Sequence, residues 1–226
     1  MKKILASFLT LFILLFCTSC NNINYEERKN IQEIENAARS YLNPFFDKVT
    51  VENVSSSENV YFVLCNVSSS GKFFDISAKI ELKYTKNNKN LKLIDGVNYK
   101  EKKFKFHATR GEYYYGKGYW TELFLIQKIS EYSIQIRCYG YDYDCNACYY
   151  DTASYSLLYL KDQHCFEFTY GSRYIPYRLY PDHIEVGTNK PNEDGSRYWS
   201  FEKTDPRSTN SFWWFDEALE IAKSRN

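Results

Sequence analysis

In many segments of this chain hydrophobic and polar residues alternate with a period of two, whereas residues 26–42 show a helical period. There, apolar side chains recur every three or four positions, at Ile31, Ile34, Ala38 and Tyr41. Such a stripe predicts an amphipathic helix. The helix should end at Asn43, because Pro44 disfavours helical geometry in the residue before it.

The alternating segments after the helix predict an antiparallel meander. Four of them are separated by turn-rich clusters of hairpin length, at residues 48–54, 60–67, 73–85 and 90–96. In the third, apolar residues from Ile76 to Leu82 alternate with polar or charged ones, which predicts one buried and one solvated face. With the helix laid across it, this order of elements resembles the cystatin-like or NTF2-like arrangement, a likeness of fold alone.

The charge run at residues 100–103 predicts a boundary between a helix-and-meander domain, 26–99, and a second domain, 104–226. The second contains short strand candidates between turn signals, at 105–108, 112–115, 121–128, 133–140, 149–160, 165–170, 178–180, 184–187 and 198–203. Their spacing predicts an up-and-down sheet, curled into a small barrel or a sandwich. Residues 211–223 predict a closing helix, so the fold class is α+β and mostly β.

Three short motifs mark the second domain. They are Gly111-Glu112-Tyr113, then Leu123-Phe124-Leu125-Ile126 leading to Ile129-Ser130, and finally Trp199-Ser200-Phe201-Glu202-Lys203. Residues 111–204, which contain them, resemble calycin-like domains of exported bacterial proteins, including some lysozyme inhibitors. The likeness covers under half of the chain, and no inhibitory residue of that family carries over to a position here.

The start of the chain has the pattern of an export signal. Lys2 and Lys3 precede residues 4–16, which carry no charge. That run is shorter than the ~20 apolar residues of a membrane-spanning helix. It matches the apolar region of a secretory signal, so residues 1–19 are predicted to be a signal peptide.

The segment Leu15-Phe16-Cys17-Thr18-Ser19-Cys20 resembles the lipobox of bacterial lipoproteins. The resemblance implies a diacylglyceryl group on the Cys20 thiol, cleavage after Ser19 and acylation of the new amine. Cys17 stands where that family prefers Leu. The alternative is ordinary signal cleavage at the same bond, which would release a soluble protein.

Lipidation would make residues 20–25 a short tether to a bacterial cell membrane or outer membrane, with the protein facing the periplasm or the cell exterior. Stable anchoring needs two or more acyl chains. Lys plus Arg total 29 against 28 for Asp plus Glu, so no polybasic patch adds to the anchor. The same balance excludes nucleic acid as an expected partner, because phosphate binding needs a basic surface.

Five cysteines remain after the leader and the anchor. Cys65 lies in an apolar strand and is expected to be a buried thiol. Cys138, Cys145, Cys148 and Cys165 are disulfide candidates in an exported protein, with three connectivities open. A zinc site from these four, a redox site at Cys145 and Cys148, and an irregular calcium site beside them are weaker alternatives, and we expect no bound metal.

No catalytic motif is present in the sequence. His107, His164 and His183 are isolated, and neither a metalloprotease nor a nucleophile-elbow spacing occurs. We therefore expect a non-enzyme without a cofactor. A hydrolase with an unfamiliar site would need these histidines to converge with Asp side chains in a cleft.

Tyrosine is the remaining signal, with 22 in the chain. A candidate binding surface comprises Tyr113, Tyr115, Tyr119, Trp120, Tyr141 and Tyr143. Exposed aromatic rings are typical contact groups for a protein and can stack on a glycan. The sequence thus predicts an envelope lipoprotein with a binding module for a protein or glycan. The alternatives are a structural surface-coat lipoprotein, whose aromatic rings are internal, and a secreted protein similar to lysozyme inhibitors.

Overall fold

The computed structural model describes residues 25–87, 90–107, 113–117, 121–142, 144–170, 174–204 and 216. Strands make up 66% of the structure, and they form three antiparallel sheets beside one helix at residues 25–42. The prediction of a mostly β fold with an N-terminal helix is therefore confirmed. Apart from Tyr25 and Asp216, which are both helical, the predicted leader, tether and closing helix lie outside the described residues.

The chain divides into two compact units. The first unit takes in residues 1–66 and 79–100, and the second takes in residues 67–78 and 101–226. The chain crosses between them inside strands, and one of these crossings, after Lys100 in β4, falls within the predicted boundary at residues 100–103.

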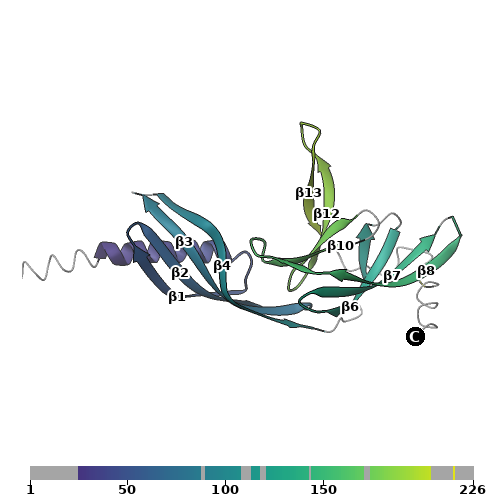
Figure 1. The fold of residues 1–226 in the computed structure, drawn as a ribbon, viewed down its shortest axis with the longest axis horizontal. Coiled ribbons are helices and arrows are strands. Elements are labelled where there is room, and N and C mark those ends of the chain that lie inside the picture. Colours follow the sequence, from purple (N-terminus) through teal and green to yellow (C-terminus); the bar gives the residue numbers. More distant parts are fainter. Residues whose placement is uncertain are drawn as a thin grey trace, which may run out of the picture. The chain divides into compact units, whose positions relative to one another are not determined.

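The first unit is a helix on a four-stranded sheet of order β1-β2-β3-β4 (Figure 1). The strands are β1 (Lys48–Ser57), β2 (Val60–Ser69), β3 (Phe74–Asn87) and β4 (Asn90–Phe106). Arg39 donates to the Val49 carbonyl at 3.0 Å, and the Lys86 ammonium lies 2.6 Å from the Glu33 carboxylate. These contacts tie the helix to β1 and β3.

The core of the first unit lies between the helix and the sheet. The side chains with no exposed surface are Ile34, Ala38, Leu42, Val63, Cys65, Ile80 and Leu82. In β3 the buried positions alternate with more exposed ones from Phe74 to Tyr84, as the sequence pattern predicts. The alternation leaves the opposite face of β3 for polar side chains.

The second unit contains two meanders. One sheet has the order β5-β6-β7-β8, from β5 (Tyr113–Lys117), β6 (Thr121–Ile129), β7 (Ser133–Asp142) and β8 (Ala147–Ser156). The other has the order β13-β12-β11-β10-β9, from β9 (Leu158–Leu160), β10 (Cys165–Tyr170), β11 (Ile175–Leu179), β12 (Ile184–Pro191) and β13 (Arg197–Lys203).

Neither meander closes, so of the two predicted forms, a small barrel or a sandwich, the barrel is wrong. The chain changes sheets at Leu157, between β8 and β9. This residue is buried, and its N–H donates to the Tyr132 carbonyl at 2.9 Å. The chain therefore leaves the sheet β5–β8 at this point and starts the sheet β9–β13, and the two sheets remain separate.

The two sheets of the second unit meet through aromatic rings. Phe124 on β6 lies 5.4 Å from Tyr170 on β10 and 5.6 Å from Tyr177 on β11, between ring centroids. Tyr155 on β8 also contacts Tyr170, at 5.6 Å. Tyr170 donates its hydroxyl to Cys138 Sγ on β7 at 3.0 Å. Two packed sheets of this kind share one core.

A second aromatic cluster holds the ends of β3 and β4 against β9 and β10 in the same unit. Its five rings, with centroids 4.7 to 5.9 Å apart, belong to Phe74, Phe104, Phe106, Tyr159 and Phe166. Nearby, Phe73 donates its N–H to the Pro181 carbonyl at 2.9 Å. Gly71 packs against that carbonyl so closely that a Cβ there would overlap it.

Candidate functional site

A groove of about 250 Å³ lies on the outer face of the first sheet, opposite the helix. Its walls come from two neighbouring strands, and its lining residues are Glu81, Lys83, Asp95, Gly96, Val97 and Asn98. The β3 residues point outward here because they alternate with the buried Ile80 and Leu82.

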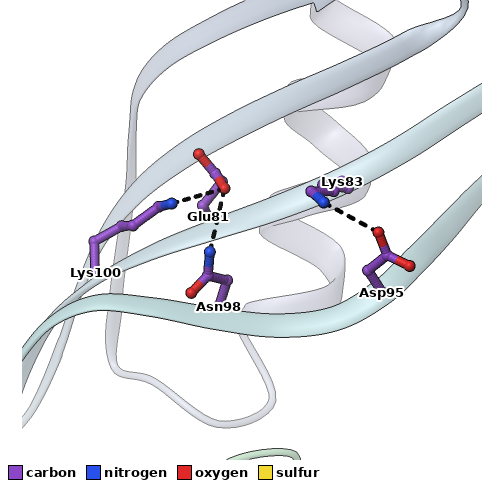
Figure 2. Close-up of polar contacts among 5 residues, drawn as sticks. All are labelled: Glu81, Lys83, Asp95, Asn98 and Lys100. Carbon is purple, nitrogen blue, oxygen red and sulfur yellow. Dashed lines mark hydrogen bonds and ion pairs between the residues drawn. The ribbon is translucent and has the colours of Figure 1, made fainter.

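Polar side chains in the groove pair across the two strands, as Figure 2 shows. Glu81 accepts from Lys100 at 3.0 Å and from Asn98 at 3.3 Å. Lys83 lies 3.1 Å from the Asp95 carboxylate. Positive and negative charges therefore balance within this set.

Strand β4 is distorted where it borders the groove. Asp95 and Gly96 both have φ of 64°, a left-handed conformation in the middle of a strand. Aspartate tolerates this region better than most residues, and Gly pays no Cβ penalty there. The distortion bends β4 away from a regular ladder, as a bulge does, and places the Asp95 carboxylate beside Lys83.

The groove has little capacity for chemistry of its own. The ladder of charges continues along the same face, because Lys79 lies 2.9 Å from Glu52, which also accepts from Asn66 at 3.0 Å. Hydrogen bonds from Lys79 and Asn66 lower the pKa of Glu52. Exposed pairs of this kind contribute ~0–1 kcal/mol each, and a solvated ion-pair ladder accounts for the face.

A different surface lies on the outer face of the five-stranded sheet of the second unit. Strand register places Trp199 opposite Asn189 and Phe201 opposite Gly187, so these positions share a face. The Arg178 guanidinium covers the Phe201 ring at 3.6 Å from its centroid. We call Arg178, Asn189, Trp199 and Phe201 the aromatic strip.

Neighbouring residues hold the aromatic strip in place. Arg178 Nε lies 3.3 Å from Glu167 Oε2, which fixes the guanidinium. At Gly187, opposite Phe201, a Cβ would approach Pro176 Cγ to 2.7 Å, so the position has no room for a side chain. Trp199 remains 40% exposed, and the residue directly opposite it on β12 is Asn189.

Beyond the strip, the far part of the β12–β13 hairpin meets solvent on both faces. Residues 189–199 are all exposed. Tyr198, opposite Lys190, is 47% exposed on the face that does not carry Trp199. We call residues 189–199 the arm. Its two aromatic rings, Tyr198 and Trp199, are both exposed and lie on opposite faces of the hairpin.

The predicted tyrosine surface is only partly described. Tyr113 and Tyr115 lie in β5, where they pair in register with Leu125 and Leu123. Tyr119, Trp120 and Tyr143 lie outside the described residues, as do the predicted lipidation residue Cys20 and the cleavage residue Ser19.

Tyr141 is a correction to the predicted surface. It is only 4% exposed, and its hydroxyl donates to the Asn146 side chain. Tyr139, two residues earlier, is 1% exposed and contacts Tyr150 at 5.5 Å. Both faces of β7 are covered at this end, so Tyr141 belongs to the core.

The cysteines separate into buried and accessible groups. Cys65 is fully buried, as predicted, and burial raises the pKa of its thiol to about 11. Cys138 and Cys165 are also buried, whereas Cys145 is exposed and Cys148 is half-buried. No disulfide joins these residues in the described chain, and the predicted disulfides remain predictions. Nor do three His, Cys, Asp or Glu side chains gather there as metal ligands would.

Each histidine has its own surroundings. His107 Nε2 lies 3.1 Å from Asp75, which lowers the pKa of that carboxyl. His183 lies 2.7 Å from Asp182 and stacks on Tyr180 with ring centroids 4.5 Å apart. His164 is 3% exposed, and burial lowers its pKa to about 4. In the sequence, only the adjacency of residues 182 and 183 pointed to one of these His–Asp pairs.

Within the described part of the chain, no helix combines the length and the apolar character needed to cross a membrane. The chain matches no protein-family model, no curated protein and no solved structure.

Proposed function

We propose that this chain is a non-catalytic lipoprotein of the bacterial envelope that binds a glycan through the aromatic strip. The observation that carries the binding proposal is the row of Trp199, Phe201 and Arg178 on one outward face. The anchoring part of the proposal rests on the sequence around Cys20.

The chemistry of the strip suits a sugar ring. A pyranose has faces of C–H groups and an edge of hydroxyls, so it stacks on a flat aromatic ring and hydrogen-bonds to polar side chains beside that ring. Trp199 offers the exposed ring, and Asn189 next to it offers both a donor and an acceptor. Arg178 and Glu167 extend the polar border with their charges paired.

The same surface suits a protein partner less well. Interface hot spots lie in well-packed pockets surrounded by a rim that excludes water. A stable protein interface also covers ~800 Å² on each partner. The strip consists of four side chains on β11, β12 and β13, and β13 is the edge strand of the sheet. A protein interface takes roughly 20–30 residues from each partner, whereas four side chains can contact a few sugar units.

Binding is tested with the full chain on an array of linear and branched oligosaccharides of neutral and N-acetylated hexoses, followed by calorimetry with the strongest hit. Trp199→Ala should weaken binding at least tenfold, equivalent to ~1.4 kcal/mol. Tyr132→Ala is the matched control, because Tyr132 is 77% exposed and lies in the β6–β7 turn. Absence of any glycan hit, or equal affinities for the wild type and Trp199→Ala, would refute glycan binding and favour a surface-coat role.

The anchor is tested separately, in cells that are fed labelled palmitate. Loss of Lys2 and Lys3 with the leader leaves 27 basic against 28 acidic residues, so net charge would not attract the protein to the membrane. Attached acyl chains would therefore have to hold it there. The wild type should take up label and Cys20→Ser should not. If the wild type takes up no label, the protein has no lipid anchor. That result would favour the alternative of a secreted protein similar to lysozyme inhibitors.

For the fold we propose that the first unit has the cystatin-like or NTF2-like arrangement and that the second is a sandwich. The helix on the meander β1–β4 supports the first assignment, and the ring contacts between two sheets support the second. A solved crystal structure of the chain is the test.

A further inference from the structure

The four cysteines of the second unit differ sharply in access. Cys138 is 6% exposed and Cys165 is 0% exposed, so both lie in the core. Cys145 is exposed in the turn between β7 and β8, and the half-buried Cys148 follows three residues later in β8. Sequence alone leaves their pairing open, but strand register restricts it.

Register excludes bonds between Cys138 and either cysteine of the turn. Cys138 is opposite Asp151, and Cys148 is opposite Tyr141. Cys148 thus lies three residues along β8 from the partner of Cys138, about 10 Å away at ~3.3 Å per residue and on the other face. A disulfide needs Cα atoms roughly 4.4–6.8 Å apart. Cys145 lies farther still, beyond the end of the β7–β8 pairing.

Strand faces exclude a bond between Cys138 and Cys165. Cys138 Sγ accepts from the Tyr170 hydroxyl, so Cys138 lies on the face of β10 that carries Tyr170. Cys165 is five residues earlier on the same strand, and an odd spacing places it on the opposite face. There its thiol hydrogen-bonds with Tyr180, and burial raises the Cys165 pKa to about 12. Little thiolate forms at such a site.

We propose that Cys145 and Cys148 form a disulfide within the β7–β8 turn, while Cys65, Cys138 and Cys165 stay as buried thiols. The two cysteines are three residues apart, and Asn146 between them has φ of 51°, a left-handed conformation in the turn that reverses the chain from β7 to β8. The proposal stands apart from the proposed function, since it requires neither an anchor nor a glycan.

The step is an exchange with an external disulfide, such as oxidised glutathione or an oxidised thiol–disulfide oxidoreductase. The thiolate of Cys145, the exposed residue, attacks a sulfur of the oxidant and releases one of its thiols. Cys148 then attacks the mixed disulfide and releases the second thiol. The two cysteine thiols are oxidised, the oxidant's disulfide is reduced to two thiols, and the two protons are retained by those thiols.

The test uses the full chain, fully reduced and then incubated with oxidised glutathione. Remaining thiols are blocked with N-ethylmaleimide, and the denatured protein is cut with chymotrypsin. Cleavage after Tyr143 and Tyr149 releases residues 144–149, which contain both turn cysteines and no other. That peptide should be lighter than its reduced form by two hydrogen atoms and should carry no maleimide.

Two variants sharpen the result. In Cys145→Ser the same peptide should carry one maleimide or one glutathione on Cys148. In Cys138→Ser, which removes a core thiol, the peptide should stay oxidised as in the wild type. Maleimide on both cysteines of the oxidised wild type, or a peptide linked to Cys138 or Cys165, would overturn the proposal. Because the turn is exposed, Cys145→Ser should fold normally.

Discussion

Phe124 fills the space between the two sheets of the second unit, and its removal measures how strongly they are packed. The side chain is fully buried, with Tyr170 and Tyr177 at centroid distances of 5.4 and 5.6 Å. Phe124→Ala removes about 100 Å³ of side-chain volume. The paired strands on either side keep the resulting void from collapsing. At ~24 cal/mol per Å³ the void costs ~2.4 kcal/mol, and the lost burial of the ring costs ~2 kcal/mol more. The free energy of unfolding should fall by about 4 kcal/mol.

Urea unfolding followed by tryptophan fluorescence is the assay. All four tryptophans, Trp120, Trp199, Trp213 and Trp214, follow residue 100 in the sequence, and the described one, Trp199, lies in β13 of the second unit, so its signal reports on that unit. With a urea dependence of ~2 kcal/mol per M, the midpoint should fall by about 2 M.

Tyr132→Ala is the control for this measurement. Its ring is 77% exposed, so the change should stay within ~0.5 kcal/mol, a midpoint shift below about 0.3 M. If Phe124→Ala shifted the midpoint no more than Tyr132→Ala does, the two sheets would not share the core described here.

Two further predictions concern buried polar groups. The folded protein keeps His164 neutral down to about pH 4, whereas the unfolded chain protonates it near pH 6.5, so stability falls as pH drops through this window, by up to ~3 kcal/mol. His164→Asn, which suits the φ of 54° there, should flatten the pH dependence of the urea midpoint, and an equally steep dependence would contradict this. The Tyr84 hydroxyl is buried with no hydrogen-bond partner among the described residues. Tyr84→Phe should therefore preserve or raise stability by ~1–2 kcal/mol, whereas Tyr170→Phe, which loses the bond to Cys138, should lower it by ~1 kcal/mol. The helical circular dichroism signal follows unfolding of Tyr84→Phe, and tryptophan fluorescence follows unfolding of Tyr170→Phe. A loss of stability in Tyr84→Phe would contradict the reasoning.

Local patterns predicted the elements well. The helix expected at 26–42 is helical over 25–42, and the strand expected at 165–170 has those bounds in β10. The burial of Cys65 and the inward face of β3 also followed from alternation. These features depend on which side of one element a residue occupies, and the period of the pattern carries that information.

The candidate site was found less well. Tyr141 looked like a surface residue because tyrosine is common at interfaces, yet neighbouring strands cover it. In the sequence analysis Trp199 and Phe201 were named only as part of a motif that resembles calycin-like domains. No pattern near them in the sequence predicts their position beside Arg178. Strand register across β11, β12 and β13 brings the three together. The run of charged residues at 100–103 suggested a domain boundary, and the division between the units does fall there, but inside the long strand β4.

The amino-acid sequence alone determined the N-terminal helix, the mostly β character of the rest, the inward face of β3 and the balance of charge, because these depend on neighbours within a few residues. Tertiary structure decided which strands share a sheet, that the meanders remain open, and which cysteines can meet. Those outcomes depend on register and on contacts between residues far apart in the chain, such as Leu157 with Tyr132 and Arg178 with Phe201. No local pattern encodes such distances, so only the folded chain could settle them.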